Sequence, residues 1–377
     1  ESIGPAQVEL ESLYQATKIA QLPGFSEILQ WTRLPVLPTA RAIAQVIQYL
    51  SLEHTGKGVL AVDVGGAAVT IAAARAGQVR LHVRSDVGTA LDSRNILQTR
   101  GLDNITRWLP FEPEPGEIES VVTQRQVHPA SMTLDSRQLL IEQAIAREAL
   151  RVTLAEARTN WPADLLGGGP SPAAGSARTT EYTRTTEYTR TLMPYLEPII
   201  GGGSTLGRAP RPGQAALMML DALEPVGVTT LVLDAGGLLP ALGACAMAQP
   251  LATVQTLDSG GLLTLGTVVT PVGRARIDET ILGLKIKYES GGDLEVEVNY
   301  GSLEVLPLPL GQKAILELKP RRMFDIGRGP GRGGKPLEVQ GGLVGLIIDA
   351  RGRPLALPKN VGKRRERIQR WLWDIGA

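Results

Sequence analysis

Hydrophobic and polar positions along the first quarter of the chain predict helical structure followed by three strands. Residues 1–56 are mainly helical by this pattern, with apolar residues recurring at the spacing of one helix face. Three short runs rich in valine, isoleucine and leucine follow at 59–64, 69–74 and 79–83, each separated from the next by a glycine-containing or polar turn. The order therefore predicts a helix that leads into a small sheet.

The longest amphipathic pattern covers residues 138–157, where apolar residues share one broad face and Glu/Arg pairs occupy the other. An α/β pattern resumes with a strand at 195–200, a helix near 214–223 and a buried strand at 229–233. We therefore expect a second α/β segment after the long helix.

The pattern changes again in the last third of the chain, where glycine and proline turns separate short alternating segments. These predicted strands lie at 281–288, 294–300, 313–318 and 344–348. The whole pattern predicts four parts: a helical lead-in (1–56), an α/β unit (57–255), a β-rich domain (256–355) and a basic C-terminal helix (356–377).

Within the α/β unit we expect a helical insertion at about 90–165 and a flexible linker at about 167–190. The linker contains the tandem hexapeptide Thr-Thr-Glu-Tyr-Thr-Arg at 179–190. Two copies are too few for a solenoid, so the repeat is either a surface insertion or a site of modification or docking.

Composition excludes several classes of protein. The 39 Lys and Arg residues balance 38 Asp and Glu residues, so no global field attracts nucleic acid. The single cysteine, Cys245, rules out an internal disulfide framework, and its apolar neighbours predict a buried, inert thiol. No apolar run approaches the roughly 18–20 residues that cross a bilayer, so we expect a cytoplasmic protein without a transmembrane segment.

Two apolar β-type runs end directly in glycines. The first ends in Asp63 and Val64 and continues into Gly65 and Gly66. Glycine lets backbone N–H groups approach an anion or a purine ring without a Cβ in the way. A second run, 195–200, ends in three glycines and a serine, which are Gly201, Gly202, Gly203 and Ser204. Together the two turns indicate a nucleotide site.

In their order, these motifs resemble the second half of the superfamily of actin, hexokinase and heat-shock chaperone ATPases. Four segments carry the resemblance: Pro38-Thr-Ala40, Asp63-Val-Gly-Gly-Ala-Ala68, Ile200-Gly-Gly-Gly-Ser-Thr205 and Pro240-Ala-Leu-Gly-Ala-Cys-Ala246. The resemblance implies an α/β, actin-like ATPase core of the ribonuclease H-like kind, followed here by the β-rich domain.

More narrowly, the chain is similar to the glutamate mutase L group (MutL-type, unrelated to mismatch repair). The segments that carry this are Leu34-Pro-Val-Leu-Pro-Thr39, Trp108-Leu-Pro-Phe111, 200–205, 325–331 and 342–352. The similarity implies an ATPase-fold accessory protein, a maturation or reactivation factor for an adenosylcobalamin-dependent mutase, which would be its partner.

The resemblance also implies roles for individual residues. Asp63 would hold Mg²⁺, Gly65 and Gly66 would face the phosphates of ATP, and the glycine turn with Ser204 would contact adenosine. Two features depart from the family pattern. Ala67 and Ala68 replace a glycine and a hydroxyl residue, and the 37 residues before Pro38 contain no further phosphate turn. We therefore expect a full site to need the chain's own N-terminal half or another protein.

Two other functions remain open, and the sequence also leaves open whether the protein forms an oligomer. One is a nucleotide-free scaffold in which the degenerate turns only hold the fold, and the other is a small-molecule kinase of the same superfamily.

Three further segments contain residues that could bind a ligand. Asp234-Ala-Gly-Gly237 fits the start of a packing helix better than a phosphate site, and residues 327–334 form a glycine- and arginine-rich loop without a P-loop lysine. The basic tail carries Trp371 and Trp373, which we expect to dock on a neighbouring element.

Overall fold

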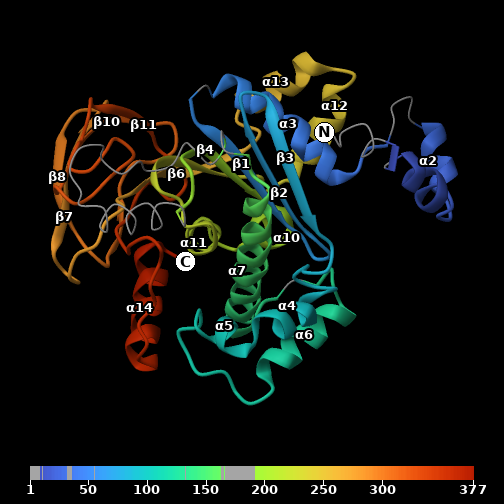
Figure 1. Cartoon of the computed structure of the whole chain (residues 1–377), viewed down its shortest axis with the longest axis horizontal. Helices are drawn as coiled ribbons and strands as arrows, with labels where there is room; N and C mark the ends of the chain where they lie inside the picture. The colour runs from blue at the N-terminus through green and yellow to red at the C-terminus, as the bar shows by residue number, and fades with distance from the viewer. Residues whose placement is uncertain are drawn as a thin grey trace, which may run out of the picture.

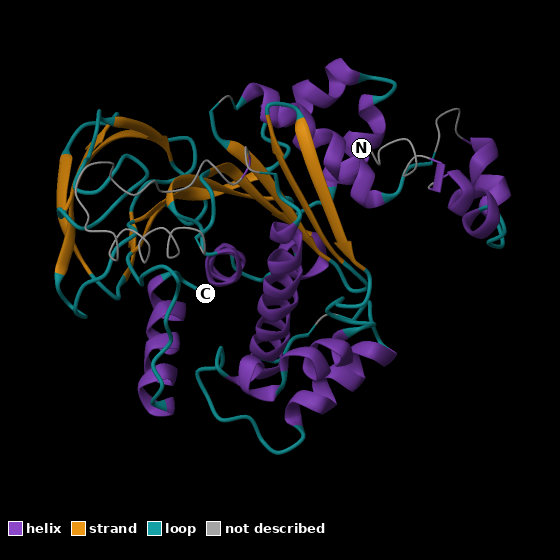
Figure 2. Cartoon of the chain, viewed as in Figure 1, coloured by secondary structure: helices purple, strands orange, loops and turns teal. Residues whose placement is uncertain are grey.

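The structure is a computed structural model, and it describes residues 9–10, 12–31, 36–54, 56–131, 133–162, 165 and 192–377. The linker and tandem repeat predicted at 167–190 lie outside the described residues. The described residues form two sheets and the helices around them (Figure 1). Figure 2 shows that strands dominate one end of the molecule and helices the other.

The larger sheet has eight strands in the order β3-β2-β1-β4-β5-β6-β12-β9. Its strands are β1 (Gly58–Val64), β2 (Val69–Arg75), β3 (Gln78–Arg84), β4 (Leu196–Gly202), β5 (Gly227–Leu233), β6 (Leu263–Thr270), β9 (Leu303–Leu306) and β12 (Leu346–Asp349). Strands β1, β4 and β5 are parallel to one another, whereas β2 and β3 return antiparallel. This mixed sheet confirms the predicted α/β class.

The smaller sheet is antiparallel, in the order β11-β10-β7-β8. Its strands are β7 (Thr280–Tyr288), β8 (Asp293–Asn299), β10 (Lys313–Pro320) and β11 (Leu337–Gln340). It confirms the β-rich region expected near the C-terminus. The same part of the chain also sends β6, β9 and β12 into the larger sheet, and the exact domain boundaries stay predictions.

Helices cover both faces of the larger sheet, because residues alternate between the faces along each strand. Leu60, Val62 and Val64 of β1 join the core cluster of α7 (Ser136–Thr159) and α11 (Pro212–Leu223). The intervening Val59 and Ala61 join the cluster of α3 (Thr39–Glu53) and α12 (Leu238–Ala246) on the other face. Asp63 continues this second series, so its side chain belongs to the α12 side.

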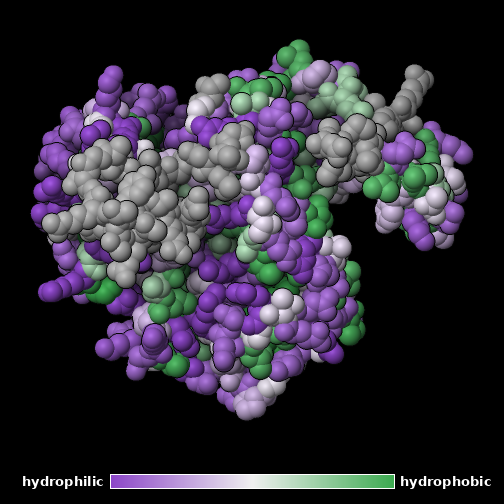
Figure 3. Space-filling view, in the orientation of Figure 1, coloured by the Kyte–Doolittle hydropathy of each residue, from purple (hydrophilic) through white to green (hydrophobic). Residues whose placement is uncertain are grey.

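The remaining helices are shorter or peripheral. They are η1 (Gln15–Ile19), α2 (Phe25–Trp31), α4 (Ser93–Arg100), α5 (Leu102–Thr106), α6 (Glu117–Val127), α10 (Gly203–Gly207), α13 (Pro250–Asp258) and α14 (Val361–Asp374). Helices α4, α5 and α6 lie around one end of α7 (Figure 1). They fall in the stretch of about 90–165 where a helical insertion is expected, and the insertion itself stays a prediction. The first helices project from the body, and their surface includes hydrophobic side chains such as Trp31, which is 81% exposed (Figure 3).

Helix α12 crosses α3 at a glycine. A Cβ on Gly243 would lie 1.9 Å from the carbonyl oxygen of Ala42, so only glycine permits this close approach.

Among the described residues, no helix has the length and apolar character needed to span a bilayer.

Two expectations about individual side chains were wrong in whole or in part. Cys245 is exposed rather than buried, because α12 turns its inward face at Leu242 and Gly243 and leaves the thiol on the outer face. In the tail, Trp371 is buried as expected but Trp373 is 83% exposed.

Candidate functional site

The candidate site lies where the parallel strands β1, β4 and β5 end side by side. Asp63 at the end of β1 is in register with Gly202 at the end of β4. The backbone N–H of Asp234, just after β5, donates to the carbonyl of Gly201 over 2.7 Å. The sheet thus places two carboxylates on either side of one glycine, at the strand ends where ligands of open α/β sheets bind.

Both carboxylates are close to Gly202. A Cβ on that glycine would lie 3.5 Å from Oδ2 of Asp63 and 3.8 Å from Oδ2 of Asp234. The absence of a side chain at Gly202 therefore leaves space between the two carboxylates. This space is the position at which a cation could contact both groups.

Asp63 has an unusual electrostatic environment. No hydrogen bond or ion pair of its side chain occurs among the described residues. Burial, and then the nearby charge of Asp234, raise its pKa to about 6. A half-buried carboxylate without a partner is destabilised in its charged form. Because a bound cation would remove that penalty, Asp63 fits the role of a metal ligand.

Asp234 has a second task that fixes its position. Its carboxylate accepts hydrogen bonds from the backbone N–H groups of Leu238 (2.7 Å) and Leu239 (2.9 Å) at the start of α12. Such capping satisfies N–H groups that the first turn of a helix leaves unpaired. The expected packing helix after Asp234 is therefore present, and the cap brings this carboxylate to the site.

Gly203 lets the end of β4 approach β1. Its φ is +86°, and a Cβ there would lie 2.5 Å from the backbone nitrogen and oxygen of Val64. Any side chain would be strained in this conformation and would also collide with β1.

The glycine run thus builds a flat backbone surface beside the carboxylates, with Gly201 packed towards Met219 beneath it.

The turn between β1 and β2 is tightly closed. The Gly65 N–H donates to the carbonyl of Ala68 over 2.9 Å, so this amide is already engaged. The carbonyls of Gly65 and Gly66 accept from the backbone N–H groups of Thr89 (3.0 Å) and Ala90 (2.9 Å), which pack over the turn. In the described structure, the amide of Gly66 is therefore better placed than that of Gly65 to face an anion.

A small hollow of about 60 Å³ lies on the α7 side of the glycine run. It is lined in part by Ser204, Thr205 and Gln143. The hydroxyl of Thr205 is 2.8 Å from that of Thr89, which links the hollow to the β1–β2 turn. Gln143 is only 1% exposed, and both its amide nitrogen and its amide oxygen lack a hydrogen-bond partner. A buried primary amide with donor and acceptor unused is suited to recognise a ligand that presents both.

The structure thus brings Asp63, the three glycines 201–203 and Ser204 to neighbouring positions, with the Gly65–Gly66 turn beside them. Sequence reasoning missed Gln143 and the Thr89–Thr205 pair. The signal for Gln143 was a polar residue within the long amphipathic helix. No local pattern marks Thr89, because its contact with Thr205 spans a separation of 116 residues.

In the described part of the chain, no group of three or more His, Cys, Asp and Glu side chains is placed to hold a metal ion. One or two carboxylates are what Mg²⁺ takes from a protein when phosphate oxygens and water complete its shell.

The loop at residues 327–334 offers no comparable site. Oδ1 of Asp325 accepts from the N–H groups of Gly327, Arg328 and Gly329 at 2.7–2.9 Å. These amides, which could have bound an anion, are satisfied by the chain itself.

Comparison with models of protein families gives a match over most of the chain. A family model described as "MutL protein" matches residues 1–260, which include every residue of the candidate site. No curated protein matches the chain.

Proposed function

Because the chain belongs to the MutL protein family, we propose that it binds an adenine nucleotide with Mg²⁺ at the ends of β1, β4 and β5. Asp63 holds the ion, and Asp234 lies close enough to add a direct or water-mediated contact. The glycine run provides the surface for ribose and base. Mg²⁺ supplies charge neutralisation at the phosphates, while these residues position the nucleotide.

One observation carries the proposal: an unpartnered carboxylate with a raised pKa faces a second carboxylate across a glycine at the ends of parallel strands. Structural carboxylates are normally paired or hydrogen-bonded. Asp63 lacks such a partner among the described residues, which favours a functional role over a purely structural one.

In its cellular role, the protein would act as an accessory factor that matures or reactivates an adenosylcobalamin-dependent mutase. Nucleotide binding would shift it between states that differ in affinity for the mutase. The test is to mix the purified protein with an inactivated mutase and measure recovery of mutase activity. The role predicts recovery that requires Mg-ATP and is lost in Asp63→Asn, whereas recovery independent of nucleotide would contradict it.

A nucleotide-free scaffold is the second candidate function. It is favoured by the closed β1–β2 turn, in which Gly65 bonds to Ala68 and no hydroxyl follows Gly66. The two candidates differ in one property, because a ligand that binds only the folded state raises the melting temperature.

Gly202→Ala separates them within one experiment. The added methyl would sit 3.5 Å from its nearest neighbours, which is an ordinary contact, so we expect the fold to lose less than about 1 kcal/mol. The methyl nevertheless fills the space between the carboxylates, so thermal stabilisation by Mg-ATP should fall strongly. Gly283→Ala in β7, where a Cβ has only 3.8 Å contacts, is the matched control. Stabilisation of neither protein by Mg-ATP would favour the scaffold, whereas equal stabilisation of both would show that nucleotide binds elsewhere than beside Gly202.

A further inference from the structure

A second hollow lies between α7, residues 355–359 and α14, and shares no residue with the candidate nucleotide site. It has a volume of about 260 Å³. Four cationic side chains line it, together with Trp108, and we call it the arginine pocket: Arg107, Arg151, Lys359 and Arg364. The surface over α14 and the helical insertion is largely hydrophilic (Figure 3).

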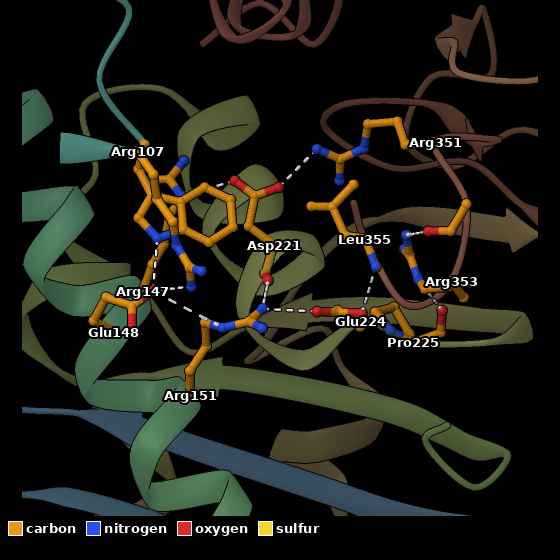
Figure 4. A network of polar contacts seen from close by, with 12 residues as sticks. Arg107, Arg147, Glu148, Arg151, Asp221, Glu224, Pro225, Arg351, Arg353 and Leu355 are labelled. Carbon is orange, nitrogen blue, oxygen red and sulfur yellow. Dashed lines mark hydrogen bonds and ion pairs between the residues drawn. The ribbon is translucent and has the colours of Figure 1, made fainter. Parts of the chain in front are cut away.

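The carboxylates beside this pocket are already used. Glu148 is fully buried and accepts hydrogen bonds from Arg107, from Arg100 (2.7 Å) and from the indole of Trp108 (2.8 Å). Although burial alone would raise its pKa, these donors lower the pKa of Glu148, so it is ionised. Glu224 accepts from Arg151 over 2.7 Å and from the backbone N–H of Leu355 over 2.8 Å (Figure 4).

Positive charge therefore exceeds negative charge at the pocket. Lys359 and Arg364 make no side-chain hydrogen bond or ion pair within the described residues, and the Nε–H groups of Arg107 and Arg364 are buried without an acceptor. Burial lowers the pKa of Arg107, and the positive charges of Arg151 and Arg100 lower it further, against the opposing effect of Glu148. Cations held together in this way leave hydrogen-bond donors for an anion.

The neighbouring buried network of Arg147, Asp221, Asp349 and Arg351 differs from the arginine pocket because its charges are paired. Asp221 accepts hydrogen bonds from Arg351 and Arg147, both at 2.7 Å (Figure 4). Arg351 also donates to Asp349 at 2.8 and 2.9 Å. In that network every carboxylate oxygen meets an arginine, and the side chains are at most 4% exposed. The arginine pocket is open, and it has cations without such partners.

The pocket is also preorganised. Arg151 is fixed by Glu224 and by the carbonyl of Asp221 (2.8 Å), and the guanidinium of Arg107 lies 4.9 Å from the centre of the Trp108 ring. Side chains that are already held in place lose little entropy when a ligand binds.

We propose that the arginine pocket binds a small oxyanion ligand, one that carries a phosphate group or carboxylate groups. Guanidinium groups match both chemistries through paired N–H donors, and Lys359 adds a point charge at the rim. The volume suits a compact metabolite rather than a nucleotide, since pockets for drug-sized ligands begin at roughly 300 Å³. This second site is independent of the proposed nucleotide site.

The test is calorimetric titration of the full chain with pyrophosphate and, separately, with citrate, in buffer freed of metal ions by a chelating resin so that no Mg²⁺ complex forms and no soluble chelator competes. The proposal predicts saturable binding of at least one of the two, weakened at least about tenfold by Arg364→Ala. Binding of pyrophosphate alone would indicate a ligand with a phosphate group, and binding of citrate alone would indicate a carboxylate ligand. Equal binding of both would support a pocket that accepts either kind of oxyanion.

Two controls keep the test sharp. Arg370→Ala removes the same charge from an exposed position on α14 outside the pocket, so it should retain wild-type affinity. Lys359→Ala, at an exposed position, is a second pocket variant that should fold whatever the fate of Arg364→Ala. Absence of binding up to about 10 mM anion would overturn the proposal. Equal losses in Arg364→Ala and Arg370→Ala would also overturn it, because non-specific attraction to α14 would then be the cause.

Discussion

Replacing Asp63 by Asn should stabilise the ligand-free protein at neutral pH, although most substitutions destabilise. Burial and Asp234 raise the pKa of Asp63 from 3.8 to about 6. The folded state therefore binds the proton more tightly than the unfolded state does. Above pH 6 the ionised carboxylate lowers the free energy of unfolding, and this penalty disappears as the pH falls through 6 towards 4.

The magnitude follows from the size of the shift. A rise from 3.8 to about 6 corresponds to at most about 3 kcal/mol, at 1.36 kcal/mol per unit. Since Asn keeps the shape without the charge, Asp63→Asn should gain about 1–3 kcal/mol at pH 8 and almost nothing near pH 4.

Urea denaturation of both proteins at pH 8 and pH 4, without Mg²⁺ or nucleotide, measures this difference. Asp258→Asn, an exposed carboxylate at the end of α13, is the matched control and should change little at either pH. Destabilisation by Asp63→Asn at pH 8, or an equal effect at both pH values, would refute the electrostatic argument.

Three further predictions concern the surroundings of the site and the core. Gln143→Leu should raise the free energy of unfolding of the ligand-free protein by about 1–3 kcal/mol in urea, because it removes two unpaired buried groups. Gly243→Ala should lower the unfolding free energy by about 1–3 kcal/mol or more in urea, since its Cβ would overlap the Ala42 carbonyl. Asp349→Asn should cost about 3–5 kcal/mol by leaving buried arginine charge uncompensated. Because Arg351 and Arg353 lower the Asp349 pKa against burial, that stabilisation should be present above pH 4 and fall in acid titrations of the wild type.

The sequence was sufficient to predict the elements around the site. Periodicity alone located β1, β2 and β3, and the glycine endings marked the ends of β1 and β4 as places of close backbone approach. These signals are local, since a strand and its following glycines are contiguous in the chain. The placement of Asp63 beside Gly202 depended on a family resemblance, because the register between two distant strands leaves no local pattern.

The environment of individual polar side chains could not be predicted in the same way. Glu148 and Gln143 are polar residues on a helix that looks amphipathic, yet they are buried where α4, α5, α6 and α11 pack against α7. Burial of this kind is decided by elements far along the chain. The same holds for β12, a four-residue strand that joins β6 in the larger sheet.

The proposed nucleotide site is tested most directly by calorimetric titration of the 377-residue protein with ATP, with and without Mg²⁺, in the wild type and in Asp63→Asn. The proposal predicts saturable binding to the wild type that requires Mg²⁺ and is lost in a variant that remains folded. Absence of binding at millimolar nucleotide, or binding that Asp63→Asn leaves unchanged, would contradict it.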